Sequence, residues 1–153
     1  MRQNKVLIID DEPELRNLIR RLLELEGFSV LTAGTSAEAL EILHKNEIEI
    51  VVSDVRLPDK SGLELLPIIK KQFPSIENII LTAYGRIEDG VNAIKDGAFD
   101  YIVKGDEDNK LIFVVKNAHE KVKMANQISH LEKNFLSKYS FDSITGSSPL
   151  ILE

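Results

Sequence analysis

In VVSDVRLPDK, residues 51–60, apolar residues run directly into the carboxylate of Asp54 before the chain turns at Pro58. A short run of β-branched residues that ends at a turn is typical of a buried strand. Five such runs occur in order: KVLIID (5–10), FSVLTA (28–33), IEIVVSD (48–54), NIILTA (78–83) and FDYIVK (99–104). Three of them are apolar nearly throughout, as expected of parallel strands covered on both faces.

Segments with helical periodicity separate these strands. The first begins at Pro13, a favoured first-turn residue, and the second opens with Thr35 followed three residues later by a glutamate, a capping box. Others begin near Ser61 and Arg86, and a long final helix begins near Asn109. The alternation predicts an α/β fold. We expect a doubly wound five-stranded parallel sheet of the common order 2-1-3-4-5, with an extended C-terminal linker helix.

Polar side chains follow the predicted strands where the strand order reverses. Asp10 and Asp11 follow the first strand, Asp54 the third, Thr82 ends the fourth and Lys104 the fifth. The carboxyl ends of parallel strands lie at one edge of the sheet, so these side chains are expected to form one site. A lysine is long enough to reach Asp54 across the intervening strand.

The chemistry of this residue set is that of phosphoryl transfer. Carboxylates this close together repel one another, which favours binding of a cation, and an all-oxygen ligand set suits Mg²⁺ better than zinc. The Thr82 hydroxyl and the Lys104 ammonium are suited to stabilise a charged phosphoryl group on a nucleophilic Asp54. The sequence therefore predicts a Mg²⁺ site and phosphorylation of Asp54.

Composition excludes several other classes of protein. The 153 residues contain no cysteine, so a disulfide framework or thiolate metal site is ruled out. The net charge of -6 argues against direct contact with nucleic acid. The N-terminal apolar run is too short for a signal peptide or a membrane span. A cytoplasmic chain without membrane contact is expected.

The motifs IIDDE, VVSDVRLPDKSG, ILTAYG and AIKDGAFDYIVK, in this order, resemble the receiver domain of two-component response regulators over residues 6–119. The resemblance implies that Asp54 accepts a phosphoryl group from a histidine kinase. It implies that Asp11, Asp54 and the backbone carbonyl of Arg56 bind Mg²⁺ directly, with Asp10 acting through water.

The same resemblance assigns roles to three further residues. Thr82 and Tyr101 would form a switch pair, in which the hydroxyl swings toward the phosphoryl group and the ring turns inward, and Lys104 would pair with the phosphate. Two departures stand out. Gly105 replaces the usual proline after Lys104, which leaves open a cis peptide there. Gly90 lies inside the fourth helix where alanine is commoner, at a cost of about 1 kcal/mol, and predicts a loose helix.

Each candidate also has a structural interpretation. Asp10 and Asp11 could cap the first helix, Asp54 could be a turn residue, and Thr82 and Tyr101 could be ordinary sheet residues. Asp59 and Gly62 are expected only to shape the turn into the third helix.

The C-terminal part predicts a longer protein. Leu111, Val115, Ala118, Val122 and Ala125 are spaced by 4, 3, 4 and 3 residues, which indicates a coiled-coil seam and a parallel homodimer. The alternative is a helix that packs on its own domain. FDSITGSSPLILE (141–153) resembles the opening of the ATPase domain in sigma-54-dependent activators. We expect a receiver domain (1–119), a helical linker (120–140) and the start of a truncated ATPase domain (141–153).

The predicted function is a phosphorylation-controlled switch that gates a downstream ATPase and DNA-binding domain through dimer geometry. No G-x-x-x-x-G-K-[ST] loop occurs, so this chain is not expected to be an enzyme beyond its own phosphorylation and dephosphorylation. One alternative is an unphosphorylated pseudo-receiver that serves as a dimerisation module. An aspartate-nucleophile phosphatase would need a second acid two residues after Asp54, where Arg56 stands.

Overall fold

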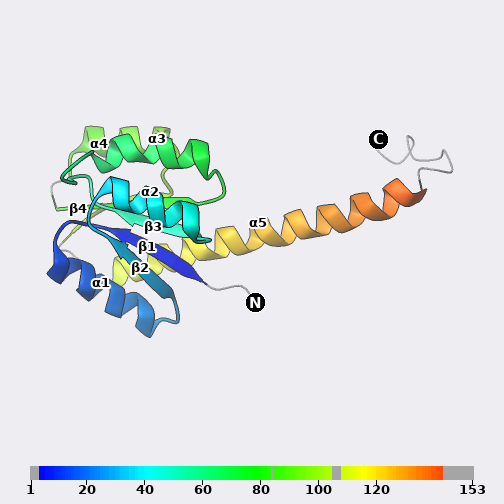
Figure 1. Cartoon of the computed structure of the whole chain (residues 1–153), viewed down its shortest axis with the longest axis horizontal. Coiled ribbons are helices and arrows are strands. Elements are labelled where there is room, and N and C mark those ends of the chain that lie inside the picture. Colours follow the sequence, from blue (N-terminus) through cyan, green and yellow to red (C-terminus); the bar gives the residue numbers. More distant parts are fainter. Residues whose placement is uncertain (1–3, 84, 105–107, 143–153) are drawn as a thin grey trace. The chain divides into compact units, whose positions relative to one another are not determined.

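The structure is a computed structural model, and it describes residues 4–83, 85–104 and 108–142. Strands and helices alternate along the chain, as the apolar runs predicted (Figure 1). In order they are β1 (Lys5–Ile9), α1 (Pro13–Leu25), β2 (Ser29–Ala33), α2 (Ser36–Lys45), β3 (Ile50–Ser53), α3 (Gly62–Gln72), β4 (Glu77–Thr82), α4 (Ile87–Lys95), β5 (Asp100–Val103) and α5 (Asp108–Asp142).

The five strands form one sheet in the order β2-β1-β3-β4-β5, and every neighbouring pair is parallel. This confirms the predicted topology. The order reverses between β1 and β3, whose registers pair Val6 with Ile50 and Ile9 with Ser53. The carboxyl ends of β1 and β3 therefore lie side by side, where ligands bind in folds of this type.

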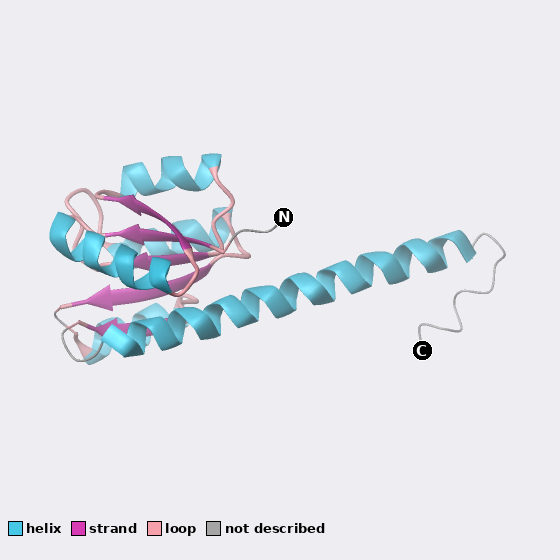
Figure 2. Cartoon of the chain, turned by 90° about the horizontal axis from the view of Figure 1, so that it is seen from below, coloured by secondary structure: helices cyan, strands magenta, loops and turns pink. Residues whose placement is uncertain are grey.

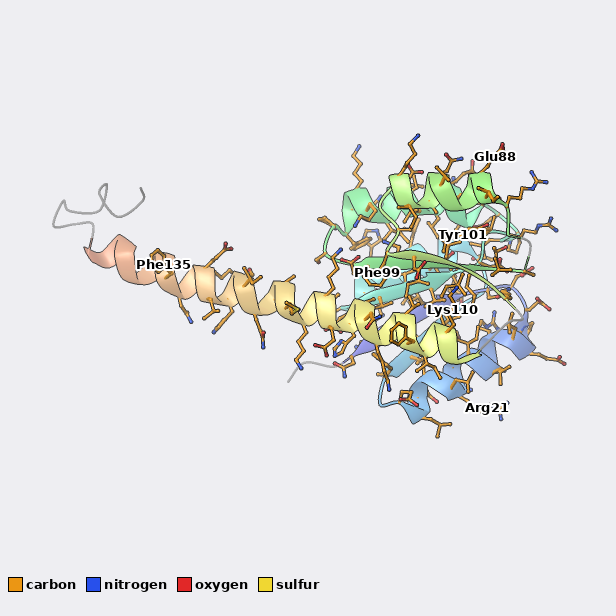
Figure 3. All side chains as sticks on the ribbon, turned by 180° about the vertical axis from the view of Figure 1, so that it is seen from behind. Arg21, Glu88, Phe99, Tyr101, Lys110 and Phe135 are labelled. Carbon is orange, nitrogen blue, oxygen red and sulfur yellow. The ribbon has the colours of Figure 1, made fainter. Side chains whose placement is uncertain are left out.

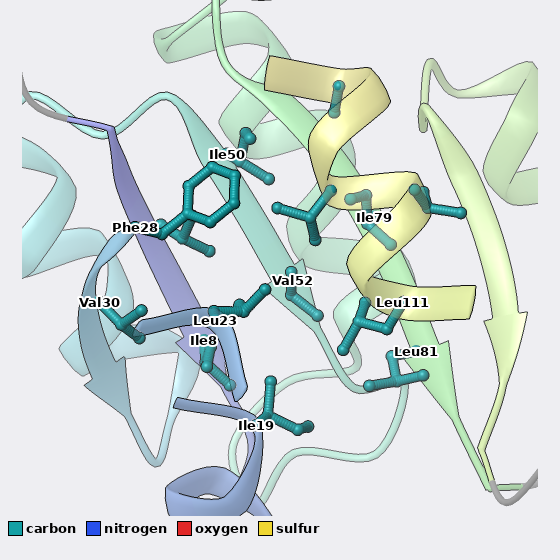
Figure 4. Packing of buried hydrophobic residues seen from close by; sticks show 14 of the residues in the cluster. Ile8, Ile19, Leu23, Phe28, Val30, Ile50, Val52, Ile79, Leu81 and Leu111 are labelled. Carbon is teal, nitrogen blue, oxygen red and sulfur yellow. The ribbon is translucent and has the colours of Figure 1, made fainter. Parts of the chain in front are cut away.

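Two apolar layers cover the sheet, because successive side chains of a strand point to opposite faces. Val6 and Ile8 of β1 pack with α1 and the first turns of α5 (Figure 4), whereas Leu7 and Ile9 pack with α2 and α3. A smaller cluster joins α3, α4 and β5. Figure 2 shows the strands between these helices. These four side chains of β1 are at most 1% exposed, which explains why the run is apolar on both faces.

Helix α5 contributes to two compact units, Met1–His119 and Glu120–Glu153. Its residues Leu111, Val115 and Ala118 belong to the core of the first unit, and Val122 is also buried, at 7% exposure. Four of the five residues of the predicted seam are therefore covered within a single chain. In the second unit Met124, Ile128, Leu131 and Phe135 are exposed. No helix within the described residues is long and apolar enough to cross a bilayer.

Candidate functional site

The backbone ladder of the sheet places two acids at the reversal point. The Asp54 amide donates to the carbonyl of Ile9 at 2.9 Å, and the Asp10 amide donates to the carbonyl of Ala33 at 3.0 Å. Each acid thus continues its strand by one residue. Both side chains are buried, Asp10 at 2% exposure and Asp54 at 9%. The buried strands β1 and β3 therefore place the carboxylates of Asp10 and Asp54 next to each other at this edge of the sheet.

Asp10, Asp11 and Asp54 form this cluster, with one oxygen from each lying within 4.8 Å of the others. Asp11 is exposed, so one side of the cluster is open to water. Three hard oxygen donors with room for water fit Mg²⁺. Asp10 also accepts from the amide of Glu12 at 2.9 Å, in front of the first turn of α1. Capping of the first helix therefore accounts for one contact of Asp10, but it does not explain why Asp54 lies in the same cluster.

Lys104 bridges the two buried acids. Its Nζ lies 2.9 Å from Asp54 Oδ2 and 3.0 Å from Asp10 Oδ2, and its side chain is 12% exposed. Burial by itself lowers the pKa of Lys104, but the hydrogen bonds and charges of Asp54 and Asp10 outweigh it, so the pKa lies above its usual value. The ammonium is therefore firmly protonated and offsets part of the negative charge.

The loop after Asp54 is held close to α3. The amide of Gly62 donates to the carbonyl of Val55 at 2.8 Å, and a Cβ at Gly62 would overlap the carbonyl oxygen of Asp54. Only glycine permits this approach. The Arg56 amide lies 3.3 Å from Asp54 Oδ1. A cavity of about 330 Å³ opens beside Asp54 and Lys104, and Arg56 also lines it.

Asp59 has a role that its place in the sequence does not reveal. Its carboxylate accepts from the Ser36 amide at 3.0 Å, the Ser36 hydroxyl at 2.8 Å and the Ala37 amide at 3.0 Å. It therefore caps α2, 22–23 residues away, in addition to lying in the turn before α3. These bonds, above all that from the Ser36 amide, lower the pKa of Asp59 to about 2.

The predicted switch residues lie on neighbouring strands. Thr82, 1% exposed, ends β4 and is paired in register with Val103, and its carbonyl accepts from the Lys104 amide at 2.6 Å. Tyr101 (Figure 3) is partly buried, and its hydroxyl accepts from the Arg86 amide at 3.2 Å. Tyr101 thus contacts the N-terminal end of α4. The Lys104–Gly105 peptide lies outside the described residues.

Comparisons with known proteins identify relatives of the chain. The family profile described as "Response regulator receiver domain" matches residues 6–116. The chain is 37% identical to an NtrX-like response regulator of Rickettsia bellii, over 97% of this chain and 31% of that protein. It is 30% identical to the DNA-binding transcriptional regulator NtrC of Proteus hauseri, over 100% of this chain and 32% of that protein. The chain spans about a third of the length of these relatives.

A solved structure extends the likeness to three dimensions. The solution structure of a beryllofluoride-activated NtrC4 receiver domain dimer superimposes with a TM-score of 0.74 at 30% sequence identity. The match covers 77% of this chain and 98% of that one.

Proposed function

The chain belongs to the response regulator receiver family, and on that premise we propose that it is a phosphorylation-controlled switch in which Asp54 accepts a phosphoryl group from a histidine kinase. The observation that carries the proposal is the position of the Asp54 carboxylate. It contacts the Lys104 ammonium and lies beside Asp10 and Asp11, which follow β1, on the wall of a cavity.

The transfer forms one bond and breaks another. A carboxylate oxygen of Asp54 attacks the phosphorus as the bond from phosphorus to the donor imidazole nitrogen breaks, and the electron pair of that bond stays on the imidazole. Lys104 Nζ, 2.9 Å from Asp54 Oδ2, is placed to compensate the charge of the incoming phosphoryl oxygens.

The residues that would hold Mg²⁺ are Asp11, Asp54 and the backbone carbonyl of Arg56 directly, and Asp10 through water. The ion supplies positive charge to the phosphoryl oxygens when it is bound. The proximity of three carboxylates within 4.8 Å supports this assignment. Thr82 would then donate its hydroxyl to a phosphoryl oxygen, and Tyr101 would follow by turning its ring inward.

We further propose that phosphorylation acts through a homodimer on an ATPase and a DNA-binding domain that follow in the full-length protein, which is cytoplasmic. The linker 120–140 would form the dimer, with neither membrane nor nucleic acid contacted by this chain. Met124, Ile128, Leu131 and Phe135 support this, because they are exposed and spaced by 4, 3 and 4 residues. The proposed ATPase segment, 141–153, lies almost wholly outside the described residues.

Neither alternative function has comparable support. A pseudo-receiver is not supported, because the acids and the lysine are present and lie together at the expected place. A phosphatase lacks its second acid, because Arg56 occupies that position. The chain itself would catalyse only its own phosphorylation and dephosphorylation.

The test is incubation of the 153-residue chain with acetyl phosphate and Mg²⁺, followed by intact mass measurement. We expect the wild type to gain the mass of one phosphoryl group and Asp54→Asn to gain none. Asp96→Asn, which removes an exposed carboxylate at the end of α4, is the matched control and should be modified like the wild type. Persistent modification of Asp54→Asn would refute the assignment.

A further inference from the structure

Two glycines lie against β5 where α4 begins. A Cβ at Gly90 would lie 3.0 Å from Tyr101 Cδ2 and 3.4 Å from Cε2, and a Cβ at Gly85 would overlap a methyl group of Val103. Tyr101 and Val103 project from the same face of β5, because they are two residues apart. Because Gly85 and Gly90 have no Cβ, the segment 85–90 can lie close to these two side chains.

The Tyr101 hydroxyl also completes the end of α4. Arg86 is the N-cap residue of this helix, and among the described residues its side chain makes no capping hydrogen bond. Its amide instead donates to the Tyr101 hydroxyl at 3.2 Å, while its carbonyl accepts from the Gly90 amide at 3.1 Å. The first turn of α4 is thus held by a side chain from β5.

Gly90 has a conformational cost that this contact explains. A glycine within a helix is destabilising by about 1 kcal/mol relative to alanine. Its φ is not in the left-handed region, so the backbone does not require glycine. What requires it is the tyrosine ring, since an added methyl group at 3.0 Å would displace the ring or the helix.

We propose that Gly90 and the Arg86 amide form a binding position for the Tyr101 ring, here called the Tyr101 seat, and that Gly90 is a positioning residue of the phosphorylation switch. The inference rests on the proposed function of Thr82 and Tyr101. The seated ring accompanies the arrangement in which Lys104 bridges Asp10 and the unmodified Asp54. In this proposal the seated ring belongs to the unphosphorylated form, so weakening the seat favours the activated form.

Gly90→Ala and Asn92→Ala, both in the 153-residue chain, separate this idea from simple helix stabilisation. Asn92 is an exposed residue of α4, so its replacement raises helix propensity in the same helix. Hydrogen exchange of the Arg86 amide should become faster in Gly90→Ala, although alanine favours the helix, and should not become faster in Asn92→Ala. Tyr101→Phe, which keeps the ring and removes the acceptor, should also speed exchange of this amide.

Coupling to the site is measured with beryllofluoride, a phosphoryl analogue, and Mg²⁺ in a titration followed by NMR. Gly90→Ala should bind it at least about threefold more tightly than the wild type, since a loss of ~0.7 kcal/mol from the competing conformation suffices for that ratio. Asn92→Ala should bind as the wild type does. Equal exchange and equal affinity in the two alanine variants would overturn the proposal, as would weaker binding by Gly90→Ala.

The two proposals can fail separately. If the wild type neither binds beryllofluoride nor is phosphorylated, the proposed function is wrong, and the exchange of the Arg86 amide still decides whether the seat exists. If Gly90→Ala does not fold, Tyr101→Phe decides: unchanged exchange of that amide overturns the seat, and faster exchange supports it.

Discussion

The charge balance of the site depends on one residue, Lys104. Two buried carboxylates, Asp10 and Asp54, share its ammonium at 3.0 and 2.9 Å. Carboxylates this close are tolerated only with a cation between them, so the lysine stabilises the fold as well as preparing the chemistry. In the proposed function the same ammonium would later contact the phosphoryl group, so it would exchange one anionic partner for another.

Replacing Lys104 should therefore destabilise the chain. Lys104→Met should lower the free energy of unfolding by about 1–3 kcal/mol, less than for a fully buried pair because water reaches the adjoining cavity. Urea unfolding measures this, and Lys71→Met, at an exposed position of α3, is the control. Mg²⁺ should restore more stability to Lys104→Met than to the wild type, because a cation then replaces the ammonium. If Lys104→Met and Lys71→Met were equally stable without metal, Lys104 would not be the residue that offsets the charge of the two buried carboxylates.

The same comparison has a defined pH dependence. The pKa of Lys104 is raised in the folded chain, so its contribution is fully present below the unfolded pKa of about 10.4 and is lost only as the pH rises above that value. Titration of Lys104 itself should consequently add no pH dependence to the stability of the wild type across neutral pH, which urea unfolding at several pH values measures.

At the scale of elements, the loop after β3 is tied to two helices at once. Gly62 brings the start of α3 against the backbone of Asp54, and Asp59 caps α2. A movement of this loop therefore affects the first turns of both helices. The Ser36 hydroxyl is 2.8 Å from the Asp59 carboxylate, so the cap includes a side chain as well as two amides.

Asp59→Ala should destabilise the chain at pH 7, because the N-terminal amides of α2 lose their acceptor. The pKa of Asp59 is lowered to about 2, so its contribution is present above the unfolded value of about 3.9 and is lost as the pH falls through about 2. Unfolding experiments at pH 7 and pH 2 should show the difference from wild type shrinking in acid. Asp59→Asn retains an acceptor and should be intermediate at pH 7; a difference independent of pH would rule out the carboxylate as the cap.

These elements show what the sequence can and cannot predict. The apolar runs predicted the strands, and the strand order then placed Asp10, Asp54 and Lys104 at one edge, because topology decides which strand ends are neighbours. The cap by Asp59 could not be found this way. Asp59 lies 23 residues from Ser36 and 22 from Ala37, so their contact depends on how two loops approach each other.

The packing of the long helix and the contact between Gly90 and Tyr101 could not be predicted from the sequence, for related reasons. A stripe spaced by 3 and 4 residues has the same pattern whether it packs on a sheet or on a second helix. The pattern therefore predicts a seam through Leu111, Val115 and Ala118, although these residues belong to the domain core. From the sequence alone, Gly90 predicts a loose helix, whereas the position of the Tyr101 ring gives a specific reason for a glycine there.

At the scale of the whole molecule, the question is what covers the exposed apolar residues of the linker. Met124, Ile128, Leu131 and Phe135 are 57, 54, 65 and 47% exposed. Helices of this kind obtain most of their stability from burying such a stripe. A second copy of the chain presents the same stripe, which is why the dimer is proposed there.

A chain ending at His119 should sediment as a monomer, and the 153-residue chain as a dimer. Ile128→Glu should weaken the dimer at full length, because it places a charge in the exposed apolar stripe of the linker. Ser129→Glu adds the same charge at an exposed position on the other side of the helix and should not. A dimer that survives truncation would instead indicate the face formed by α4, β5 and α5.

Because of the Tyr101 seat, the intrinsic tyrosine fluorescence of the chain can report on the position of the Tyr101 ring. The protein contains no tryptophan and three tyrosines, so its ultraviolet emission is dominated by tyrosine. One of these rings packs at the start of α4 with its hydroxyl in a hydrogen bond. In a chain with Tyr84→Phe and Tyr139→Phe, the fluorescence would come from Tyr101, and the change of state could be followed in real time without any attached dye.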